Sequence, residues 1–321
     1  MTNHAAIKYP STGQFRHATK LLRGKGKIAY QGTIKLHGTN GNLVMFEDGK
    51  IYCQSKERML AEGCDNAGFW AAMQNVDLDE LFDLVKARFY ENNGYEATYP
   101  IIISGEWAGG NIQKGVAING LEKFFCIFGV KVGDCWQPLY DYCMLQDNAS
   151  NIYNALQFPT YEVEIDFDQP ELSQNTLVEI TEAVEAECPV GKFFGKSGVG
   201  EGVVWKPLGR ELVANTETWF KVKGEKHSVS KVKTLAAVDP EKLASINDFV
   251  KYACTEARME QGIQEVGLDF ALIGPFLGWM NRDIIKEESD VLAANGLTMN
   301  EVGRQISNTA KQFYLSKLKE A

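Results

Sequence analysis

Two hydrophobic periods occur along the chain, one typical of strands and one typical of helices. Short apolar runs predict strands at 27–36, 42–46, 50–54, 100–104, 123–132, 202–207 and 219–223. Asp48 and Gly49 predict a hairpin turn between the second and third of these runs. Apolar residues at helical spacing predict helices at 78–94 and 173–188. This mixture favours an α+β fold.

Beyond residue 238 the strand pattern almost disappears. Asp239 is suited to a helix N-cap and Pro240 to a first helical turn. Further on, Thr298 and Glu301 have the spacing of a capping box, in which a carboxylate bonds the N-cap backbone N–H. We therefore expect two domains, an α+β domain at 1–233 and a small all-helical domain at 239–321.

Composition narrows the class of protein. The chain has 321 residues, and no apolar stretch approaches the roughly 20 residues of a membrane span. The first residues lack the pattern of a secretory signal. Seven cysteines without a CxxC pair argue against a disulfide framework and a zinc site. We expect a cytoplasmic protein that does not associate with membranes.

Charge is unevenly distributed. The formal net charge of −9 argues, taken alone, against a nucleic-acid partner. Residues 192–233, however, contain nine Lys or Arg and only four Glu, whereas residues 239–321 contain nine Lys or Arg and thirteen Asp or Glu. A polyanion should therefore approach the 192–233 region.

Candidate chemistry centres on Lys35, which ends a predicted strand and precedes a glycine turn. A nucleophilic lysine needs a neutral amine, and the ordinary lysine pKa of about 10.4 must fall through neighbouring cations or desolvation. Lys221 and Lys223 alternate on a predicted strand, so both side chains share one face and are suited to this task and to binding a polyphosphate. Glu201, at a strand start, is suited to holding a divalent metal.

An aromatic residue and a second acid complete a possible nucleotide site. Phe128 is suited to stacking on a nucleobase, and Glu106 to accepting a ribose hydroxyl. Each residue also fits a structural explanation, because Phe128 lies in an aromatic run typical of a core and the acids fit solvated strand ends. His37 has no further ligand at metal spacing, so the sequence does not predict a zinc pair there.

The ordered set of motifs resembles a known family. It consists of "KLHGTN" at 35–40, "SGEWAG" at 104–109, "FCIFGVKV" at 125–132, "EGVVWKP" at 201–207 and "WFKVKGEK" at 219–226. It is similar to the motifs of covalent polynucleotide ligases, in particular the RNA ligase 2 type of T-even bacteriophages and the RNA-editing ligases. The resemblance implies an ATP-grasp-like nucleotidyltransferase domain of antiparallel sheets with helices, followed by a helical domain that engages duplex RNA.

The resemblance also implies a set of site residues. Lys35 would be the nucleophile that becomes AMP-lysine, assisted by His37, Glu201, Lys221 and Lys223, with Glu201 also serving the metal. ATP would be contacted by Ile34, Lys35, Asn40, Glu106, Phe128, Lys206, Lys221 and Lys223. The family has an arginine that meets the RNA end, for which this chain offers Lys56 or Arg58. An aspartate commonly follows the stacking aromatic residue, whereas Gly129 follows Phe128 here.

The predicted function follows from this resemblance. It is an ATP- and Mg²⁺- or Mn²⁺-dependent RNA ligase that seals 3′-hydroxyl and 5′-phosphate ends, most of all nicks in duplex RNA, without a protein partner. A phage-encoded enzyme of RNA repair would act in the host cytoplasm. The alternatives are a ligase acting mainly on DNA, a capping-type nucleotidyltransferase and a catalytically silent RNA-binding relative.

Overall fold

The structure is a computed structural model that describes residues 4–224 and 246–320. The chain divides into two compact units, Met1–Val222 and Lys223–Ala321. The expected domain limits at 233 and 239, together with the predicted helix start at Asp239 and Pro240, lie outside the described residues. Within the described ranges, no helix is both long and apolar enough to cross a membrane.

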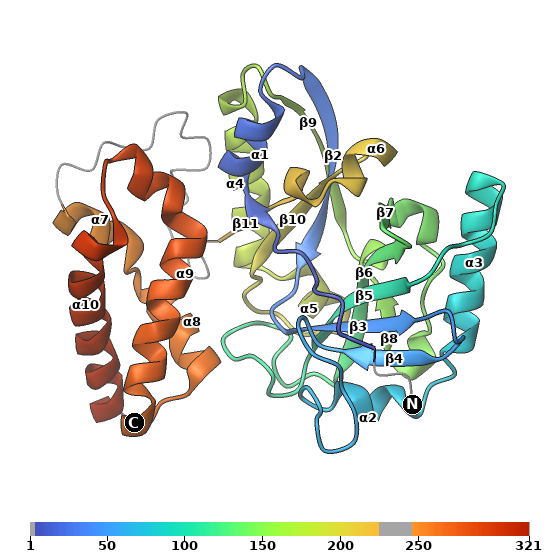
Figure 1. Ribbon diagram of the computed structural model, residues 1–321, viewed down its shortest axis with the longest axis horizontal. Helices are drawn as coiled ribbons and strands as arrows, with labels where there is room; N and C mark the ends of the chain where they lie inside the picture. Colours follow the sequence, from blue (N-terminus) through green and yellow to red (C-terminus); the bar gives the residue numbers. More distant parts are fainter. Residues whose placement is uncertain (1–3, 225–245, 321) are drawn as a thin grey trace. The chain divides into compact units, whose positions relative to one another are not determined.

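The first unit is a mixed α+β structure (Figure 1). Its strands are β1 (Gly13–Gln14), β2 (Lys27–Lys35), β3 (Thr39–Met45), β4 (Ile51–Gln54), β5 (Ile101–Ala108), β6 (Phe124–Val132), β7 (Cys135–Gln137), β8 (Ile152–Asn154), β9 (Thr160–Asp166), β10 (Gly202–Pro207) and β11 (Phe220–Lys223). Its helices are α1 (Phe15–Leu22), α2 (Phe69–Met73), α3 (Asp79–Asn93), α4 (Glu171–Ala186), α5 (Pro189–Phe193) and α6 (Arg210–Ala214). The predicted strands and both predicted helices are confirmed within a few residues.

Sheet A contains five strands in the order β1-β11-β10-β2-β9. The residues of β2 alternate between two environments, because successive side chains of a strand point to opposite faces. Tyr30 and Ile34 are buried, whereas Thr33 and Lys35 are half-buried. On the buried face the rings of Tyr30 and Phe220 lie 5.2 Å apart. Sheet A therefore has a core face and a second face, on which Lys35 lies.

Sheet B contains six strands, with β4-β3-β5-β6-β7 in order and β8 paired to β6. Strand β3 begins at Thr39, earlier than the apolar pattern predicts, because Asn40 pairs with Glu106 across the ladder to β5. One face of the sheet is packed by α2, whose Phe69 ring lies 5.7 Å from Trp107 and 5.0 Å from Phe125. Asn40 and Glu106 are on the opposite face, so this second face of sheet B carries the polar residues.

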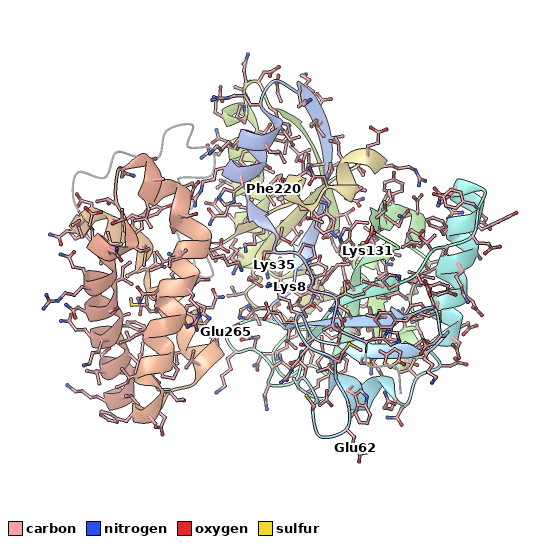
Figure 2. All side chains as sticks on the ribbon, viewed as in Figure 1. Lys8, Lys35, Glu62, Lys131, Phe220 and Glu265 are labelled. Atoms are coloured by element: carbon pink, nitrogen blue, oxygen red, sulfur yellow. The ribbon has the colours of Figure 1, made fainter. Side chains whose placement is uncertain are left out.

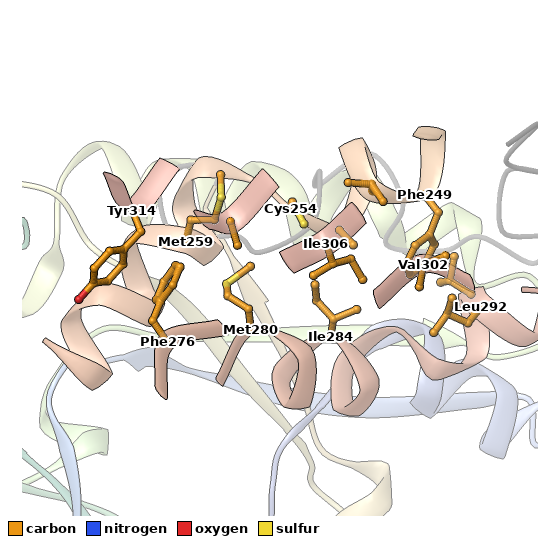
Figure 3. Packing of buried hydrophobic residues seen from close by; sticks show 14 residues of the cluster. Phe249, Cys254, Met259, Phe276, Met280, Ile284, Leu292, Val302, Ile306 and Tyr314 are labelled. Carbon is orange, nitrogen blue, oxygen red and sulfur yellow. The ribbon is translucent and has the colours of Figure 1, made fainter. Parts of the chain in front are cut away.

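The second unit is helical throughout its described part, as expected. It contains α7 (Ile246–Ala253), α8 (Glu256–Val266), α9 (Ile273–Ala294) and α10 (Met299–Glu320). Figure 3 shows its apolar core, which includes Phe276, Ile284, Ile306 and Tyr314, all fully buried. At the start of α10 the Thr298 N–H donates to Glu301 Oε2 at 2.7 Å, which is the predicted capping contact.

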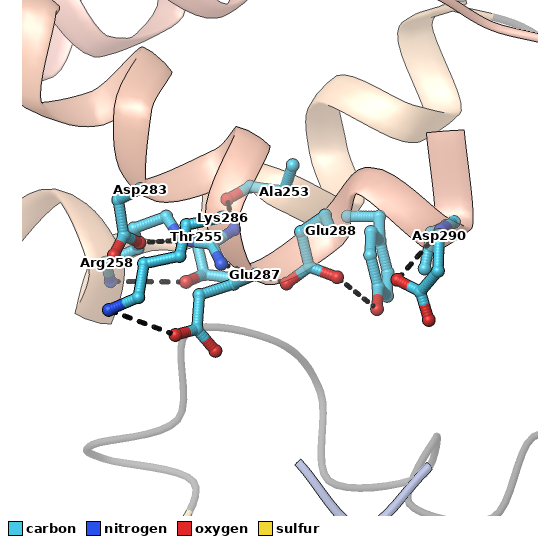
Figure 4. A network of polar contacts seen from close by, with 10 residues as sticks. Ala253, Thr255, Arg258, Asp283, Lys286, Glu287, Glu288 and Asp290 are labelled. Atoms are coloured by element: carbon cyan, nitrogen blue, oxygen red, sulfur yellow. Dashed lines mark hydrogen bonds and ion pairs between the residues drawn. The ribbon is translucent and has the colours of Figure 1, made fainter. Parts of the chain in front are cut away.

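A buried arginine joins three segments of the helical unit (Figure 4). Arg258 is fully buried, and its Nε donates to Asp283 Oδ2 at 3.0 Å. Its Nη2 lies 2.8 Å from Oε1 of the fully buried Glu288, and its Nη1 donates to the Ala253 carbonyl oxygen. A buried carboxylate is tolerated only when it is paired, so Glu288 depends on this arginine.

The first prediction concerns this network. Substituting Arg258→Ala should lower the free energy of unfolding of the helical unit by about 3–5 kcal/mol, because the buried Glu288 loses the arginine that pairs with it. Hydrogen exchange of the α8 and α9 amides, measured in the full chain, should accelerate accordingly. Arg304→Ala removes an exposed arginine of α10 and serves as the control. Unchanged exchange in the Arg258 variant would show that the pairing does not support the unit.

Candidate active site

The turn after β2 joins the two sheets and brings their polar faces together. Lys35 ends β2 in sheet A opposite Gly202 of β10, and Asn40 pairs with Glu106 in sheet B. Between them, Gly38 approaches the sheet closely, since a Cβ at this position would overlap the Trp107 carbonyl oxygen. Glycine is therefore required in the turn, and Lys35 is fixed where the two sheets meet.

Glu201 is the centre of the contacts around Lys35. Its carboxylate is 1% exposed, and Oε2 lies 2.7 Å from Lys35 Nζ and 3.2 Å from His37 Nδ1. The Lys35 side chain, labelled in Figure 2, is 21% exposed and is therefore only partly covered by its neighbours. Because Glu201 directly precedes β10, the β2–β10 pairing places it beside the lysine.

Glu106 holds the same turn from sheet B. Its Oε1 accepts a hydrogen bond of 2.9 Å from the Gly38 N–H. The neighbouring Asn40 is held by Asn42, whose Nδ2 donates to Asn40 Oδ1 at 2.7 Å. The structure thus brings together predicted site residues from both sheets. Glu106 of β5 and Glu201, directly before β10, both contact the segment between β2 and β3.

The electrostatic state of Lys35 differs from the expectation of a neutral amine. Burial lowers its pKa, but the opposing effects of Glu201 and Glu106 are together larger, and the pKa is raised above its ordinary value. Lys221 and Lys223, which we expected to lower this pKa, are not among the groups that shift it here, and their effect on the amine stays a prediction. Burial and Glu201 in turn raise the pKa of Glu106, although Lys35 lowers it in part.

Phe128 is placed by a β-bulge that sequence patterns do not reveal. In the β5–β6 ladder Ser104 pairs with Gly129 and Gly105 with Ile127, so Phe128 is an extra residue without a partner. Bulges of this kind redirect a side chain and leave backbone groups unpaired. The Phe128 carbonyl oxygen accepts from Lys206 Nζ of sheet A at 2.8 Å. This bond links the polar faces of the two sheets.

The contacts of Lys206 are with a carbonyl oxygen and aromatic rings. Its Nζ is 4.1 Å from the Trp219 ring centroid and 5.7 Å from that of Phe128. Burial lowers the pKa of Lys206 to about 7. Gly129 stands where the family that this sequence resembles commonly has an aspartate. A Cβ on Gly129 would lie 3.2 Å from the Trp136 ring and 3.6 Å from Lys206 Nζ, so these two side chains leave little space for a larger residue.

Lys221 and Lys223 are half-buried and alternate with the buried Phe220 and Val222 along β11. The Phe220 ring stacks on Trp205 in the core of sheet A, so the two lysines are on the face that carries Lys35. This confirms the predicted shared face. The side chain of Ile34, by contrast, is buried on the core face, which leaves only its backbone for a ligand contact.

The loop after β4 contains both candidates for binding the RNA end. Arg58 is exposed, and its Nη2 donates to the Asp65 carbonyl oxygen at 2.9 Å. Lys56 is half-buried, and its Nζ donates to Ser11 Oγ at 3.4 Å. Because Arg58 binds within its own loop and Lys56 contacts the N-terminal segment, the two side chains are held in different surroundings.

The acids of this site suit a metal that also binds phosphate. In residues 4–224 and 246–320 no group of three or more His, Cys, Asp or Glu side chains is arranged to hold a metal ion. Mg²⁺, however, is commonly bound by one or two carboxylates together with substrate phosphates and water. Glu201, with Glu106 across the turn, fits that requirement.

Tyr9 is a residue of this site that the sequence did not predict. Its ring lies 5.4 Å from that of Phe128 and 5.3 Å from that of Trp136. Burial, and secondarily the charge of Glu106, raise the pKa of Tyr9. No local pattern marks such a residue, because all its ring contacts are distant in sequence.

Comparison with known proteins establishes the class. A family model described as RNA ligase matches residues 28–223, more than half of the chain, and the chain therefore belongs to the RNA ligase family. A comparison with curated proteins gives no match.

Solved structures to which this chain is similar include several of an RNA ligase from Naegleria gruberi. A variant with ATP and Mn has 15% sequence identity and a TM-score of 0.46, and a variant with AMP and Mn has 14% and 0.45. The same enzyme with PPi has 15% identity and a TM-score of 0.44. Each alignment covers 68% of this chain, which spans 56% of the Naegleria chain.

The second prediction concerns the ion pair of Lys35. In Glu201→Gln the pKa of Lys35 should fall, because the carboxylate that raises it is lost while burial still lowers it. The pH dependence of acetylation by acetic anhydride, read at Lys35 by mass spectrometry, should move to lower pH. Glu164→Gln is the matched control. Glu164 of β9 forms a surface ion pair with Lys27, which is in the same strand as Lys35. An unchanged Lys35 profile in Glu201→Gln would contradict this assignment.

Proposed function

We propose that this protein is an ATP-dependent RNA ligase that joins 3′-hydroxyl and 5′-phosphate ends through an AMP-lysine at Lys35. The observation that carries the proposal is the half-buried amine of Lys35, held 2.7 Å from the buried Glu201 between two polar sheet faces. Membership of the RNA ligase family supports the choice of reaction.

The first step would form a bond between Lys35 Nζ and the α-phosphorus of ATP and release pyrophosphate. The amine must first lose a proton, and Glu201 Oε2 is close enough to accept it. Lys221 and Lys223 would bind phosphate oxygens as the charge on them changes. A divalent cation, Mg²⁺ or Mn²⁺, would neutralise phosphate charge and favour the neutral amine, with Glu201 as the residue to hold it.

The nucleoside would bind between the polar faces of the two sheets. Phe128, which the bulge places on this side, would stack on adenine. Glu106 would contact the ribose, and His37 and Asn40 would maintain the turn around Lys35. In the second step AMP would pass to the RNA 5′-phosphate, and in the third the 3′-hydroxyl would displace AMP, with Lys56 or Arg58 at the RNA end.

We further propose that the helical part of the chain, 239–321, engages duplex RNA and that 1–233 carries adenylation. Duplex RNA is recognised by its shape and its 2′-hydroxyls, which requires no motif for reading base edges. The substrate that best fits an adenylation part joined to a duplex-binding part is nicked duplex RNA. The reaction would be nick sealing, as in the RNA ligase 2 branch and in phage RNA repair.

The third prediction tests the nucleophile. After incubation with labelled ATP and magnesium, Lys35→Ala should carry no protein-bound AMP, whereas wild type and Lys27→Ala should be labelled. Lys27 is a suitable control because it begins the same strand and is exposed. Persistent labelling of Lys35→Ala would remove Lys35 from this role. Labelling of wild type by GTP in place of ATP would favour a capping-type enzyme.

The fourth prediction tests the substrate. A nick in duplex RNA should be sealed about tenfold or more faster than the same nick in DNA, since even one lost hydrogen bond to a 2′-hydroxyl costs about this factor. Ligated product is measured on a gel with strands of identical sequence. Equal sealing of the all-DNA nick would defeat the RNA assignment.

A further inference from the structure

A cavity of about 150 Å³ lies between the N-terminal segment and sheet B. Lys35 is not among the residues that line it. Its walls are Ile7, Lys8, Tyr9, Pro10, Asn42, Ile102, Ser104, Lys131, Trp136 and Thr216. Asn42 and Ser104 pair directly across the β3–β5 ladder, two residues along from the pair of Asn40 and Glu106. The cavity therefore shares the polar face of sheet B with the candidate active site.

The N-terminal segment is fixed over this cavity by main-chain hydrogen bonds. The Ile7 N–H donates to Gln54 Oε1 at 3.0 Å, and Gln54 Nε2 donates to the Ile7 carbonyl oxygen at 2.6 Å. Two residues on, the Tyr9 N–H donates to the Lys56 carbonyl oxygen at 3.2 Å. The Tyr9 ring packs edge-on against Trp136. The roof and the aromatic wall are thus held in place by bonds to the edge strand and its loop.

Two polar atoms at the cavity lack a hydrogen-bond partner among the described residues. They are Asn42 Oδ1 and Ser104 Oγ, from side chains that are 1% and 0% exposed. The orientation of Asn42 is fixed, since its Nδ2 donates both to Asn40 Oδ1 and to the Ser55 carbonyl oxygen. Buried polar groups are nearly always paired, so an acceptor and a hydroxyl without partners call for a ligand or water.

The shape and lining of the cavity select the chemical class of the ligand. Drug-sized ligands occupy roughly 300–1,000 Å³, so this space suits a single ring system. Tyr9 and Trp136 supply aromatic surface, which suits a flat ring. Asn42 Oδ1 requires a donor, and the Ser104 hydroxyl beside it is able to donate. A nucleobase with an amino group next to a ring nitrogen, as in adenine and cytosine, presents this pair of groups.

The position of the cavity favours a base of the RNA strand. The floor bonds to Ser55 and the roof to Lys56, so the cavity adjoins the loop that is proposed to bind the RNA end. Lys8 and Lys131, labelled in Figure 2, are two cationic residues among those that line the cavity. Lys8 pairs with the exposed Glu57 at 3.3 Å, and Lys131 pairs with the exposed Asp134 at 3.7 Å.

We infer that this cavity is a subsite for one amino-bearing nucleobase of the RNA strand whose end is to be joined. The inference rests on the proposed function for the identity of the strand. It adds to the Lys35 site a second contact, which would hold the RNA by a base close to its reactive end. Contact with a base edge would give the enzyme a preference for adenine or cytosine over uracil at that nucleotide.

The experiment measures binding of short oligoribonucleotides by intrinsic tryptophan fluorescence, with the contribution of Trp136 taken as the difference between wild type and Trp136→Phe, because the chain has six tryptophans. Oligo(A) and oligo(C) should quench the wild-type signal at lower concentration than oligo(U), and the quenching should be absent in Trp136→Phe. Ser104→Val, which fills the cavity and removes the hydroxyl, should weaken oligo(A) binding at least tenfold. Ser104→Ala removes the hydroxyl without filling the space and should weaken binding less. Ile7→Trp fills the cavity from the roof and checks the result if Ser104→Val disturbs the sheet.

ATP labelling of the same variants separates the possible outcomes. It should remain at the wild-type level in Ser104→Val and Ile7→Trp, because the inference places an RNA base in the cavity. Unchanged oligonucleotide binding in both filled variants would show that the cavity holds only water. A raised KM for ATP with unchanged RNA binding would show that the base belongs to ATP. Quenching without any self-adenylation of wild type would uphold the nucleobase subsite and reject the proposed ligase function.

Discussion

The buried carboxylate of Glu201 is the contact on which the rest of the site depends. A charge removed from water must be paired, and Glu201 is paired by Lys35 and approached by His37. This requirement ties the end of β2 to the start of β10 and fixes the chain as it leaves sheet A. Glu106 of sheet B accepts a hydrogen bond from the Gly38 N–H of the same turn. Two acids from two sheets thus determine the path of a single turn.

The neighbours of each lysine, more than its depth, decide its charge. Lys35 and Lys206 are on the same face of sheet A, yet the pKa of Lys35 is raised and that of Lys206 is lowered to about 7. The difference arises because Lys35 has carboxylates beside it, whereas Lys206 has a carbonyl oxygen and aromatic rings. In this structure Lys35 therefore acts as the charged partner of Glu201.

Much of the fold could be predicted because it rests on local patterns. The spacing of apolar residues revealed α3, α4 and most strands of both sheets, and strand alternation placed Lys221 and Lys223 on one face. The strand at β9 was missed although its residues alternate. The raised pKa of Lys35 was not foreseen, since its partner Glu201 is 166 residues away and no local pattern reports their distance. The bulge at Phe128 and the packing of Tyr9 likewise arise only from tertiary contacts.

The one-residue offset in β6 also bears on how the length of this chain can change. Because Phe128 has no partner, Gly129 pairs with Ser104 and Lys131 with Ile102, each one residue further along β6 than a regular ladder would give. Loss of Phe128 would restore a regular ladder and leave Lys131 opposite Ile102, but the chain would lose the extra residue whose carbonyl oxygen binds Lys206. A deletion at the bulge would therefore preserve the sheet and remove its link to Lys206, whereas a change in the length of a surface loop would leave both unchanged.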